Sequence, residues 1–181
     1  MEILSFWGLA GYLLLWIPNF ALLAQPLYQA TQGELSEPLE PKSYVCSAFN
    51  ALKQAILSAP ALTLPDFSRP LILYTTERHK IALGVLGQMQ GPSFPPTAHL
   101  SKQLDTTIQG WPACLCALAI ATLLTQESKK LTFGIPMVIY SLTLSKWVIY
   151  PLTLTQDHGS SIPFLYPTTP HHPPRITQVL F

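Results

Sequence analysis

The chain has 181 residues, of which 49% are hydrophobic and only 10% charged, and its formal net charge is +1. Disordered chains combine few apolar residues with high net charge, so this composition excludes an intrinsically disordered protein. Ten basic residues against nine acidic ones also exclude a protein that binds nucleic acid through overall charge, although not one with a local basic patch. The 18 prolines argue against a long helical bundle. Three cysteines are too few for a disulfide framework and predict a reducing compartment.

The first feature along the chain is the uncharged stretch Ile3–Ala24. It is long enough to span a bilayer, which takes about 20 apolar residues. However, the basic flank typical of signal peptides and of many transmembrane helices is missing, and Pro18 disfavours helical geometry at Ile17. These observations favour a buried helix that stops at Ile17, with a membrane-spanning segment as the alternative.

Two further helices follow in chain order. Phe20–Thr31 has a partial apolar stripe and is followed by Gly33, a typical helix stop. Ser43–Ser58 is the clearest amphipathic helix, because its apolar side chains recur at intervals of three and four. The segment 34–42 between them contains glutamates and prolines and is predicted to be an exposed loop.

The pattern then changes to short β-rich runs. The charged tip 77–80 joins the first two of them, as in a hairpin of antiparallel strands. Trp111–Glu127 is predicted to be a helix, and because it is apolar on nearly every face we expect it to be buried against the sheet. Beyond Ser141 the periodic pattern ends, and 151–181 is rich in proline. The predicted strands are Leu71–Thr75, Ile81–Gln88, Thr97–Leu100 and 136–140.

Six segments stand out along the chain: FWGLAGYLLLWIPNFALLAQPLYQAT, AFNALKQAILSAPALTLPDFSRPLILYTTE, IALGVLGQ, HLSKQLD, GWPACLCALAIATLL and KKLTFGIPM. In this order and spacing they resemble the Pol polyprotein of gammaretrovirus-like elements, including endogenous retroviruses. The similar region is the end of the reverse transcriptase thumb and the connection domain, also described as the retrotransposon-derived RNase H-like domain. The resemblance covers residues 4–140.

The resemblance implies an α/β (α+β) fold, an RNase H-like connection domain with a short, antiparallel-led mixed sheet and packed helices. The expected division is 1–33 as thumb-like helices, 34–140 as the RNase H-like connection domain, and 141–181 as an unpacked, proline-rich tail. The chain departs from the family at Leu14, where the family usually carries arginine, and after Tyr140, where the segment no longer aligns. The loss of that arginine explains why the first helix is so apolar.

The metal-dependent chemistry of such polyproteins is not expected here. RNase H chemistry holds two divalent metals with about four carboxylates, because these cations prefer oxygen ligands. The first strand ends in Thr75-Thr76, where family connection domains commonly have an aspartate, and the last predicted strand leads into Ile139-Tyr140-Ser141, again without a carboxylate. Glu77 alternates to the side opposite Thr76 and is predicted to be a solvated tip residue. We therefore expect no catalytic residue, no metal site and no cofactor.

Two smaller motifs are predicted to be structural. Cys114 and Cys116 point about 200° apart on a helix, so they are expected to be buried structural cysteines and not zinc ligands. Gly84 and Gly87 lack the spacing of a phosphate-binding loop and are expected to allow close packing or a strand bulge.

Basic residues of the connection-like region are the candidate nucleic-acid contacts. In the resembled family, thumb and connection cradle an RNA–DNA hybrid through its backbone, a sequence-independent mode. The alternative interpretation is that these charged side chains are scattered over the surface and only keep the protein in solution. The candidates are Lys53, Arg69, Arg78, Lys80 and Lys102.

The sequence therefore predicts a catalytically inactive thumb–connection fragment of a retroviral reverse transcriptase, with a structural role and at most sequence-independent hybrid contact. Its expected partners are an RNA–DNA hybrid and other Pol domains, with no small-molecule substrate, and its expected location is intracellular and cytoplasmic. The alternative is a small membrane-anchored protein that uses residues 3–24 as its span.

Overall fold

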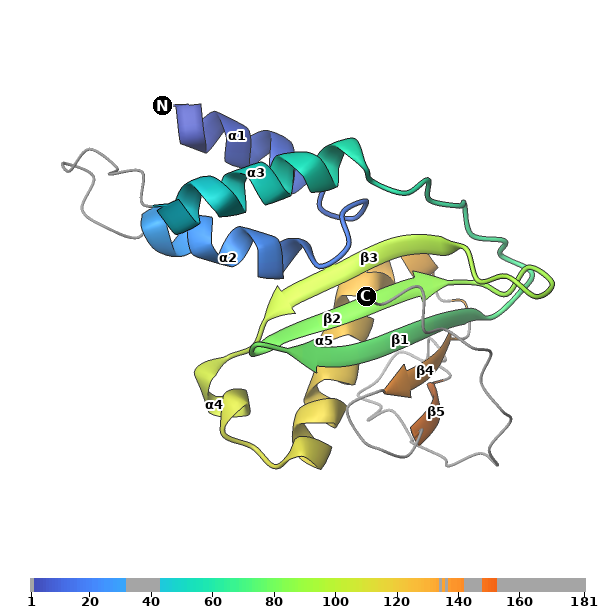
Figure 1. Cartoon of the computed structure of the whole chain (residues 1–181). Helices are drawn as coiled ribbons and strands as arrows, with labels where there is room; N and C mark the ends of the chain where they lie inside the picture. Colours follow the sequence, from blue (N-terminus) through green and yellow to red (C-terminus); the bar gives the residue numbers. More distant parts are fainter. Residues whose placement is uncertain (1, 32–42, 134, 136, 142–147, 153–181) are drawn as a thin grey trace.

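The computed structural model describes residues 2–31, 43–133, 135, 137–141 and 148–152. Figure 1 shows two parts: a helical layer of α1, α2 and α3, and a twisted sheet with α5 behind it. The elements are α1 (Glu2–Tyr12), α2 (Phe20–Thr31), α3 (Ser43–Leu57), β1 (Leu71–Arg78), β2 (Ile81–Gly87), β3 (Pro96–Gln103), α4 (Thr106–Gln109), α5 (Ala113–Thr132), β4 (Met137–Ser141) and β5 (Val148–Leu152).

The first helix is shorter than its apolar run predicts. α1 ends at Tyr12 and not at Ile17, and the chain turns back through a hydrogen bond from the Trp16 N–H to the Leu13 carbonyl oxygen (3.0 Å). Asn19 has a positive φ of 57°, which lets α2 start in a new direction. No helix in the described part of the chain is long and apolar enough to cross a membrane.

The three helices share a small apolar core. Its buried members are Ala10 of α1, Ile17 of the connection to α2, Leu27 of α2 and Leu52 of α3. The predicted bounds of α2 are confirmed. The helix α3 ends at Leu57, one residue before the predicted end at Ser58. By packing, α3 lies with α1 and α2, although the expected division at residue 33 places it with the sheet. The predicted loop 34–42 lies outside the described residues.

The sheet has the strand order β3-β2-β1-β4-β5. β1, β2 and β3 form an antiparallel meander, β4 lies parallel to β1, and β5 is antiparallel to β4. The turn between β1 and β2 has positive φ at both His79 (51°) and Lys80 (64°), as the favoured two-residue hairpin turns require. The predicted hairpin and the mixed sheet are confirmed.

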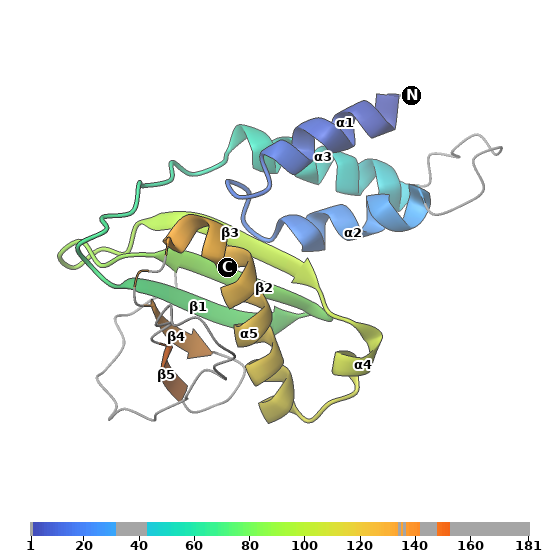
Figure 2. The ribbon, with the colours of Figure 1, turned by 180° about the vertical axis from the view of Figure 1, so that it is seen from behind.

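α5 crosses one face of the sheet, as Figure 2 shows from behind. Its inner side packs Ile120 and Leu124 against Leu73 and Ile139, and all four side chains are fully buried. The expected packing of this helix on the sheet is confirmed, but the helix is not buried all round, because the sheet covers only one of its sides. Leu115 is 49% exposed and Leu118 38% exposed on the outer side.

Two glycines allow close contacts, as the sequence predicts. A Cβ on Gly84 would lie 2.9 Å from Leu124 Cδ1, so this glycine lets α5 approach β2. A Cβ on Gly87 would lie 2.6 Å from the Pro95 carbonyl oxygen, and the β2–β3 register shifts between Leu86 and Gly87. Gly87 therefore marks a bulge.

The sheet continues beyond the last predicted strand. The sequence pattern predicts no strand after Tyr140, but β5 pairs with β4, with Ser141 opposite Val148 and Met137 opposite Leu152. The expected tail from residue 141 thus contributes one strand to the sheet. Residues 153–181 lie outside the described part of the chain.

The edge of β3 joins the two parts of the molecule. The His99 N–H donates to the Leu15 carbonyl oxygen (2.9 Å), and the Ser101 Oγ accepts from the Ala21 N–H (3.0 Å). The His99 side chain is only 4% exposed, and its Nε2 has no hydrogen-bond partner among the described residues. Burial lowers the pKa of His99 to about 4, so the imidazole is neutral in the folded protein at neutral pH.

Candidate nucleic-acid interface

The positions on β1 and β4 where RNase H chemistry would require metal-binding carboxylates carry hydroxyl groups. Parallel pairing places Thr75 of β1 opposite Ser141 of β4. Thr75 is fully buried and its hydroxyl donates to the Tyr140 carbonyl oxygen (3.3 Å). The Ser141 hydroxyl is buried without a hydrogen-bond partner among the described residues. Neutral hydroxyls of this kind do not supply the negative charge that divalent metals need.

Two of the described carboxylates stabilise turns. Asp66 accepts hydrogen bonds from the hydroxyl and the N–H of Ser68 (2.7 and 3.0 Å) and pairs with Arg69 Nε (3.3 Å). Asp105 accepts from the Thr107 N–H (2.8 Å) and caps α4. These bonds, chiefly those from Ser68 and Thr107, lower the pKa of both carboxyl groups. Both carboxylates are therefore engaged in local turn structure.

Two other carboxylates have separate partners. Glu77 Oε1 accepts from the Lys80 N–H (3.0 Å) within the hairpin turn, and Glu127 of α5 forms an ion pair with Lys102 of β3. Glu77 faces the α5 side, opposite Ala82, as strand alternation predicts. Within the described residues, no three His, Cys, Asp or Glu side chains gather into a set that would hold a metal ion.

The cysteines are only partly as expected. Cys116 is buried. Its pKa is raised, mainly by burial and to a smaller extent by the negative charge of Glu77. Cys114 is exposed, so the expectation that both are buried is wrong. Because the two cysteines are two residues apart on α5, they point about 200° apart. One therefore faces the sheet and the other faces solvent.

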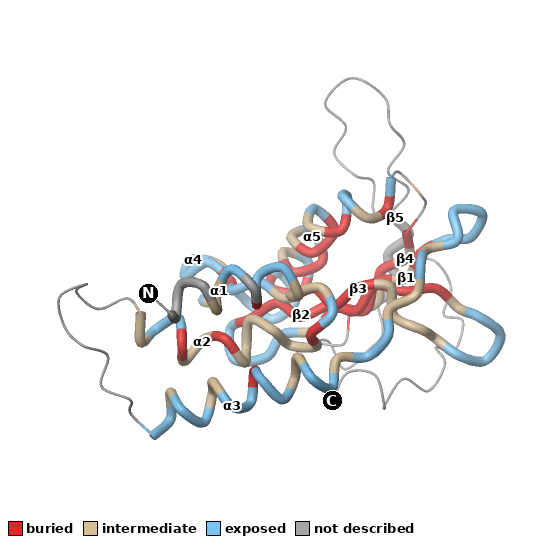
Figure 3. Tube along the Cα trace, turned by 90° about the horizontal axis from the view of Figure 1, so that it is seen from above, coloured by how far each residue is buried: buried red, intermediate tan, exposed pale blue. Residues whose placement is uncertain are grey.

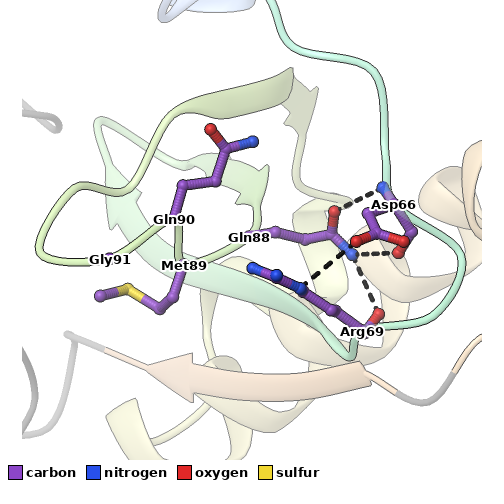
Figure 4. A pocket seen from close by; sticks show the side chains of 6 residues that line it. All are labelled: Asp66, Arg69, Gln88, Met89, Gln90 and Gly91. Atoms are coloured by element: carbon purple, nitrogen blue, oxygen red, sulfur yellow. Dashed lines mark hydrogen bonds and ion pairs between the residues drawn. The ribbon is translucent and has the colours of Figure 1, made fainter.

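A pocket of about 360 Å³ lies where the loop before β1 meets the end of β2 (Figure 4). Gln88 points from the strand into this loop: its Oε1 accepts from the Asp66 N–H (2.7 Å), and its Nε2 donates to the carbonyl oxygens of Asp66 (2.8 Å) and Arg69 (2.9 Å). Every polar group of this amide is thus used within the protein. Gln88 thus fixes the loop. The residues that line the pocket do not include a nucleophilic side chain paired with a general base. It is lined by Asp66, Arg69, Gln88, Met89, Gln90 and Gly91.

The structure separates the five predicted basic residues into three places. Arg78, Lys80 and Lys102 lie at the hairpin end of the sheet, because Lys102 is opposite Ala82 and the Leu104 N–H donates to the Lys80 carbonyl oxygen (3.0 Å). Arg69 precedes β1 at the other end of that strand, and Lys53 lies on α3. The five therefore do not form one face.

Ion pairing divides them further. Arg69 is paired with Asp66 and Lys102 with Glu127, both at the surface. Lys53 lies over the Phe49 ring, with Nζ 5.6 Å from its centroid. Arg78 and Lys80 are exposed and have no ion-pair partner among the described residues. The hairpin tip, defined as Arg78, His79 and Lys80, is the part of this set most available to a phosphate backbone.

A family model described as the RNase H-like domain found in reverse transcriptase matches residues 45–139. The chain belongs to this family. The Pol polyprotein of Feline endogenous virus ECE1 and the Gag-Pol polyprotein of Baboon endogenous virus (strain M7) are both 49% identical to it over 138 residues, 76% of this chain. The Gag-Pol polyprotein of Koala retrovirus is 46% identical over 133 residues. The RNase H-like chain spans only 13%, 8% and 8% of these three polyproteins.

Solved structures show the same fold at lower identity. The foamy viral protease-reverse transcriptase in complex with RNA/DNA hybrid, and its dRH form in complex with ds DNA, each superimpose with a TM-score of 0.68 at 20% identity. The match covers 77% of this chain, and 19% and 24% of those chains. The predicted RNase H-like α/β fold and the retroviral Pol resemblance are thus confirmed.

Four exposed residues of this RNase H-like domain are missing from the sequence-based set of candidates. Phe67 lies in the loop before β1, and Phe133 ends α5 directly after its last turn, which contains Lys129 and Lys130. The Lys-Lys pair is visible in the sequence. The closeness of Phe133 to Phe67 is not visible there, because it depends on how the loop before β1 folds against the end of α5.

Proposed function

We propose that this chain is a non-catalytic, architectural segment of a retroviral reverse transcriptase, which connects polymerase and RNase H modules and contacts an RNA–DNA hybrid at the hairpin tip. The observation that carries the proposal is the distribution of carboxylates. Asp66, Glu77, Asp105 and Glu127 lie in different places, and each is already engaged by a neighbouring donor. Two-metal hydrolysis requires such groups to converge on one site.

The hairpin tip supports the hybrid contact. Its two cationic side chains, Arg78 and Lys80, project from a tight turn, and Lys102 lies beside them on β3. Cations that meet phosphate groups bind without reading base sequence. A related foamy viral reverse transcriptase was solved in complex with an RNA/DNA hybrid, which agrees with this role.

The helical layer supports the architectural role. An apolar groove of about 340 Å³ opens between its three helices, lined by side chains that include Phe6, Trp7 and Phe49. In our proposal residues 1–33 are thumb-like and, together with α3, face other Pol domains in the cytoplasm. Residues 34–140 supply the connection unit, and 141–181 supply β5 and the proline-rich segment.

A nuclease assay tests the lack of catalysis. The purified chain is incubated with Mg²⁺ and a labelled RNA–DNA hybrid, and we expect no cleavage. Magnesium-dependent cleavage that disappears in Glu77→Gln would overturn the proposal, because Glu77 is the carboxylate nearest the end of β1.

A binding titration at several salt concentrations tests the hairpin tip. We expect the double variant Arg78→Gln/Lys80→Gln to lower the slope of log affinity against log salt by about 1.8, because each phosphate contact contributes about 0.9. Lys53→Gln is the matched control, since it removes one exposed charge from α3, and we expect its slope to equal that of the unaltered chain. An unchanged slope in the tip variant, or an equal loss in the control, contradicts a contact at the tip.

A further inference from the structure

Two exposed aromatic rings meet at the end of the sheet opposite the hairpin tip. Phe67 comes from the loop before β1 and Phe133 from the end of α5, and their ring centroids are 6.0 Å apart at an interplanar angle of 71°. Phe67 is 60% exposed and Phe133 is 76% exposed. Single exposed apolar residues are common on protein surfaces. Two adjacent rings that leave most of their surface in water are a different feature.

Phe133 has an energetically unfavourable backbone conformation. Phe133 has a left-handed conformation with φ of 46° and ψ of 34°. This region is uncommon for residues other than glycine and asparagine, and it is less favourable for a bulky side chain. The fold thus keeps a large ring in solvent at a helix end where a small residue is the usual choice.

Three basic residues are close to the two rings in sequence. Lys129 and Lys130 occupy the last turn of α5, immediately before Phe133, and both are exposed. Neither has an ion-pair partner among the described residues. Arg69 follows Phe67 by two residues and pairs with Asp66. Lysines at a helix C-terminus complement the helix dipole, which explains the charge but not the pair of exposed rings.

We propose that Phe67, Phe133, Lys129, Lys130 and Arg69 form a platform for single-stranded nucleic acid. Unpaired bases stack on the two rings, and the lysines and the arginine meet the phosphates. Base–aromatic stacking combined with cations is how proteins bind single strands without sequence preference. Bases within a duplex already stack on each other, so the platform prefers a single strand to an RNA–DNA hybrid.

The platform is spatially separate from the hairpin tip. β1 runs from Leu71 to Arg78, so about 25 Å of strand lies between the two sites at about 3.3 Å per residue. Figure 1 shows the two ends of β1 at opposite ends of the sheet. The platform therefore does not rest on the proposed hybrid contact, and each can be tested without disturbing the other.

Fluorescence anisotropy with the full chain and a labelled 12-nucleotide oligo(dT) tests the platform. We expect the double variant Phe67→Ala/Phe133→Ala to bind oligo(dT) about tenfold more weakly than the unaltered chain, with unchanged affinity for an RNA–DNA hybrid. Tyr44→Ala is the matched control, because Tyr44 is an exposed aromatic residue on α3, and we expect it to leave oligo(dT) binding unchanged.

Two further variants separate stacking from folding and from charge. Phe67→Tyr/Phe133→Tyr keeps both rings, and we expect it to bind oligo(dT) as the unaltered chain does. Lys129→Gln/Lys130→Gln is expected to lower the salt slope for oligo(dT) by about 1.4, since each contact to a single strand contributes about 0.7. The proposal is overturned if the unaltered chain does not bind oligo(dT) at low salt, or if the alanine double variant binds it equally well.

Discussion

The sheet layer and the helical layer bury their apolar side chains to different extents. The sheet and α5 share one continuous core that includes Leu73, Leu86, Ile120 and Ile139. The helical layer has few buried residues, and aromatic side chains of α1 and α3 remain partly exposed along its groove. Figure 3 shows the contrast, with buried segments concentrated in the sheet and the inner side of α5, and α3 mostly exposed. This contrast predicts that the sheet layer carries most of the folding stability.

The largest expected effect tests the sheet core. Leu73→Ala removes a fully buried side chain between β1 and α5, and we expect it to lower the free energy of unfolding by about 4 kcal/mol. Urea unfolding followed by circular dichroism measures this loss. Leu64→Ala is the control, because Leu64 is exposed, and we expect a change within about 0.5 kcal/mol. A loss below about 1 kcal/mol for Leu73→Ala would contradict a core centred on the sheet.

The next effect concerns the junction between the layers. Folding lowers the pKa of His99 from 6.5 to about 4, so between these pH values the unfolded chain binds a proton that the folded chain does not. Stability contributed by neutral His99 is thus complete above pH 6.5 and is lost as the pH falls toward 4. A shift of this size corresponds to about 3 kcal/mol.

Unfolding measurements at pH 4, 5.5 and 7 test this junction. We expect His99→Leu to remove most of the slope between pH 4 and 6.5. The carboxyl groups of Asp66 and Asp105, whose pKa values are lowered, contribute mainly below that window, because most of their stabilisation is lost as the pH falls through 3.8 and below. An equal slope in the variant and in the unaltered chain would show that His99 is not the group that titrates.

A smaller effect is expected in the helical layer. Leu52→Ala removes a buried side chain of α3, and we expect a loss of about 2 kcal/mol because the surrounding cluster is small. Native-state hydrogen exchange distinguishes local from global loss. Faster exchange confined to α2 and α3 supports two layers of unequal stability, whereas equal acceleration in β1 and β2 would show that the layers unfold as one unit.

The smallest effect concerns the ion pair between Lys102 and Glu127. Both side chains are about half exposed, so Glu127→Gln is expected to change stability by about 0.5 kcal/mol or less. Thermal unfolding at low and high salt measures it. A loss above about 1.5 kcal/mol would mean that this pair contributes to the attachment of α5 to the sheet.

The sheet meander was predictable because its signals are local. Apolar runs flank the charged tip 77–80, and this pattern defines a hairpin without knowledge of the rest of the chain. β5 and α4 lack such signals: β5 contains Pro151, and α4 is a single short turn capped by Asp105. Their presence depends on β4 and on the connection to α5, which the sequence pattern does not reveal.

The candidate site was predictable by residue type but not by arrangement. Arg78 and Lys80 are two residues apart in the sequence and stay together in the hairpin turn. The pairing of Lys102 with Glu127 and the meeting of Phe67 with Phe133 join residues that are far apart in the chain. Such contacts are set by strand register and by the path of α5, so composition and periodicity do not indicate them.

The parallel pairing of β1 with β4 also determines the order in which the protein can fold during synthesis. β1, β2 and β3 follow one another through short connections, but the second edge of β1 has no partner until Met137–Ser141 has been made, after the whole of α5. Until then the apolar strand Leu71–Arg78 presents unpaired backbone groups, which readily pair with other chains. A ribosome that stalls before Met137 would therefore release a chain prone to self-association through β1, and not a smaller stable domain.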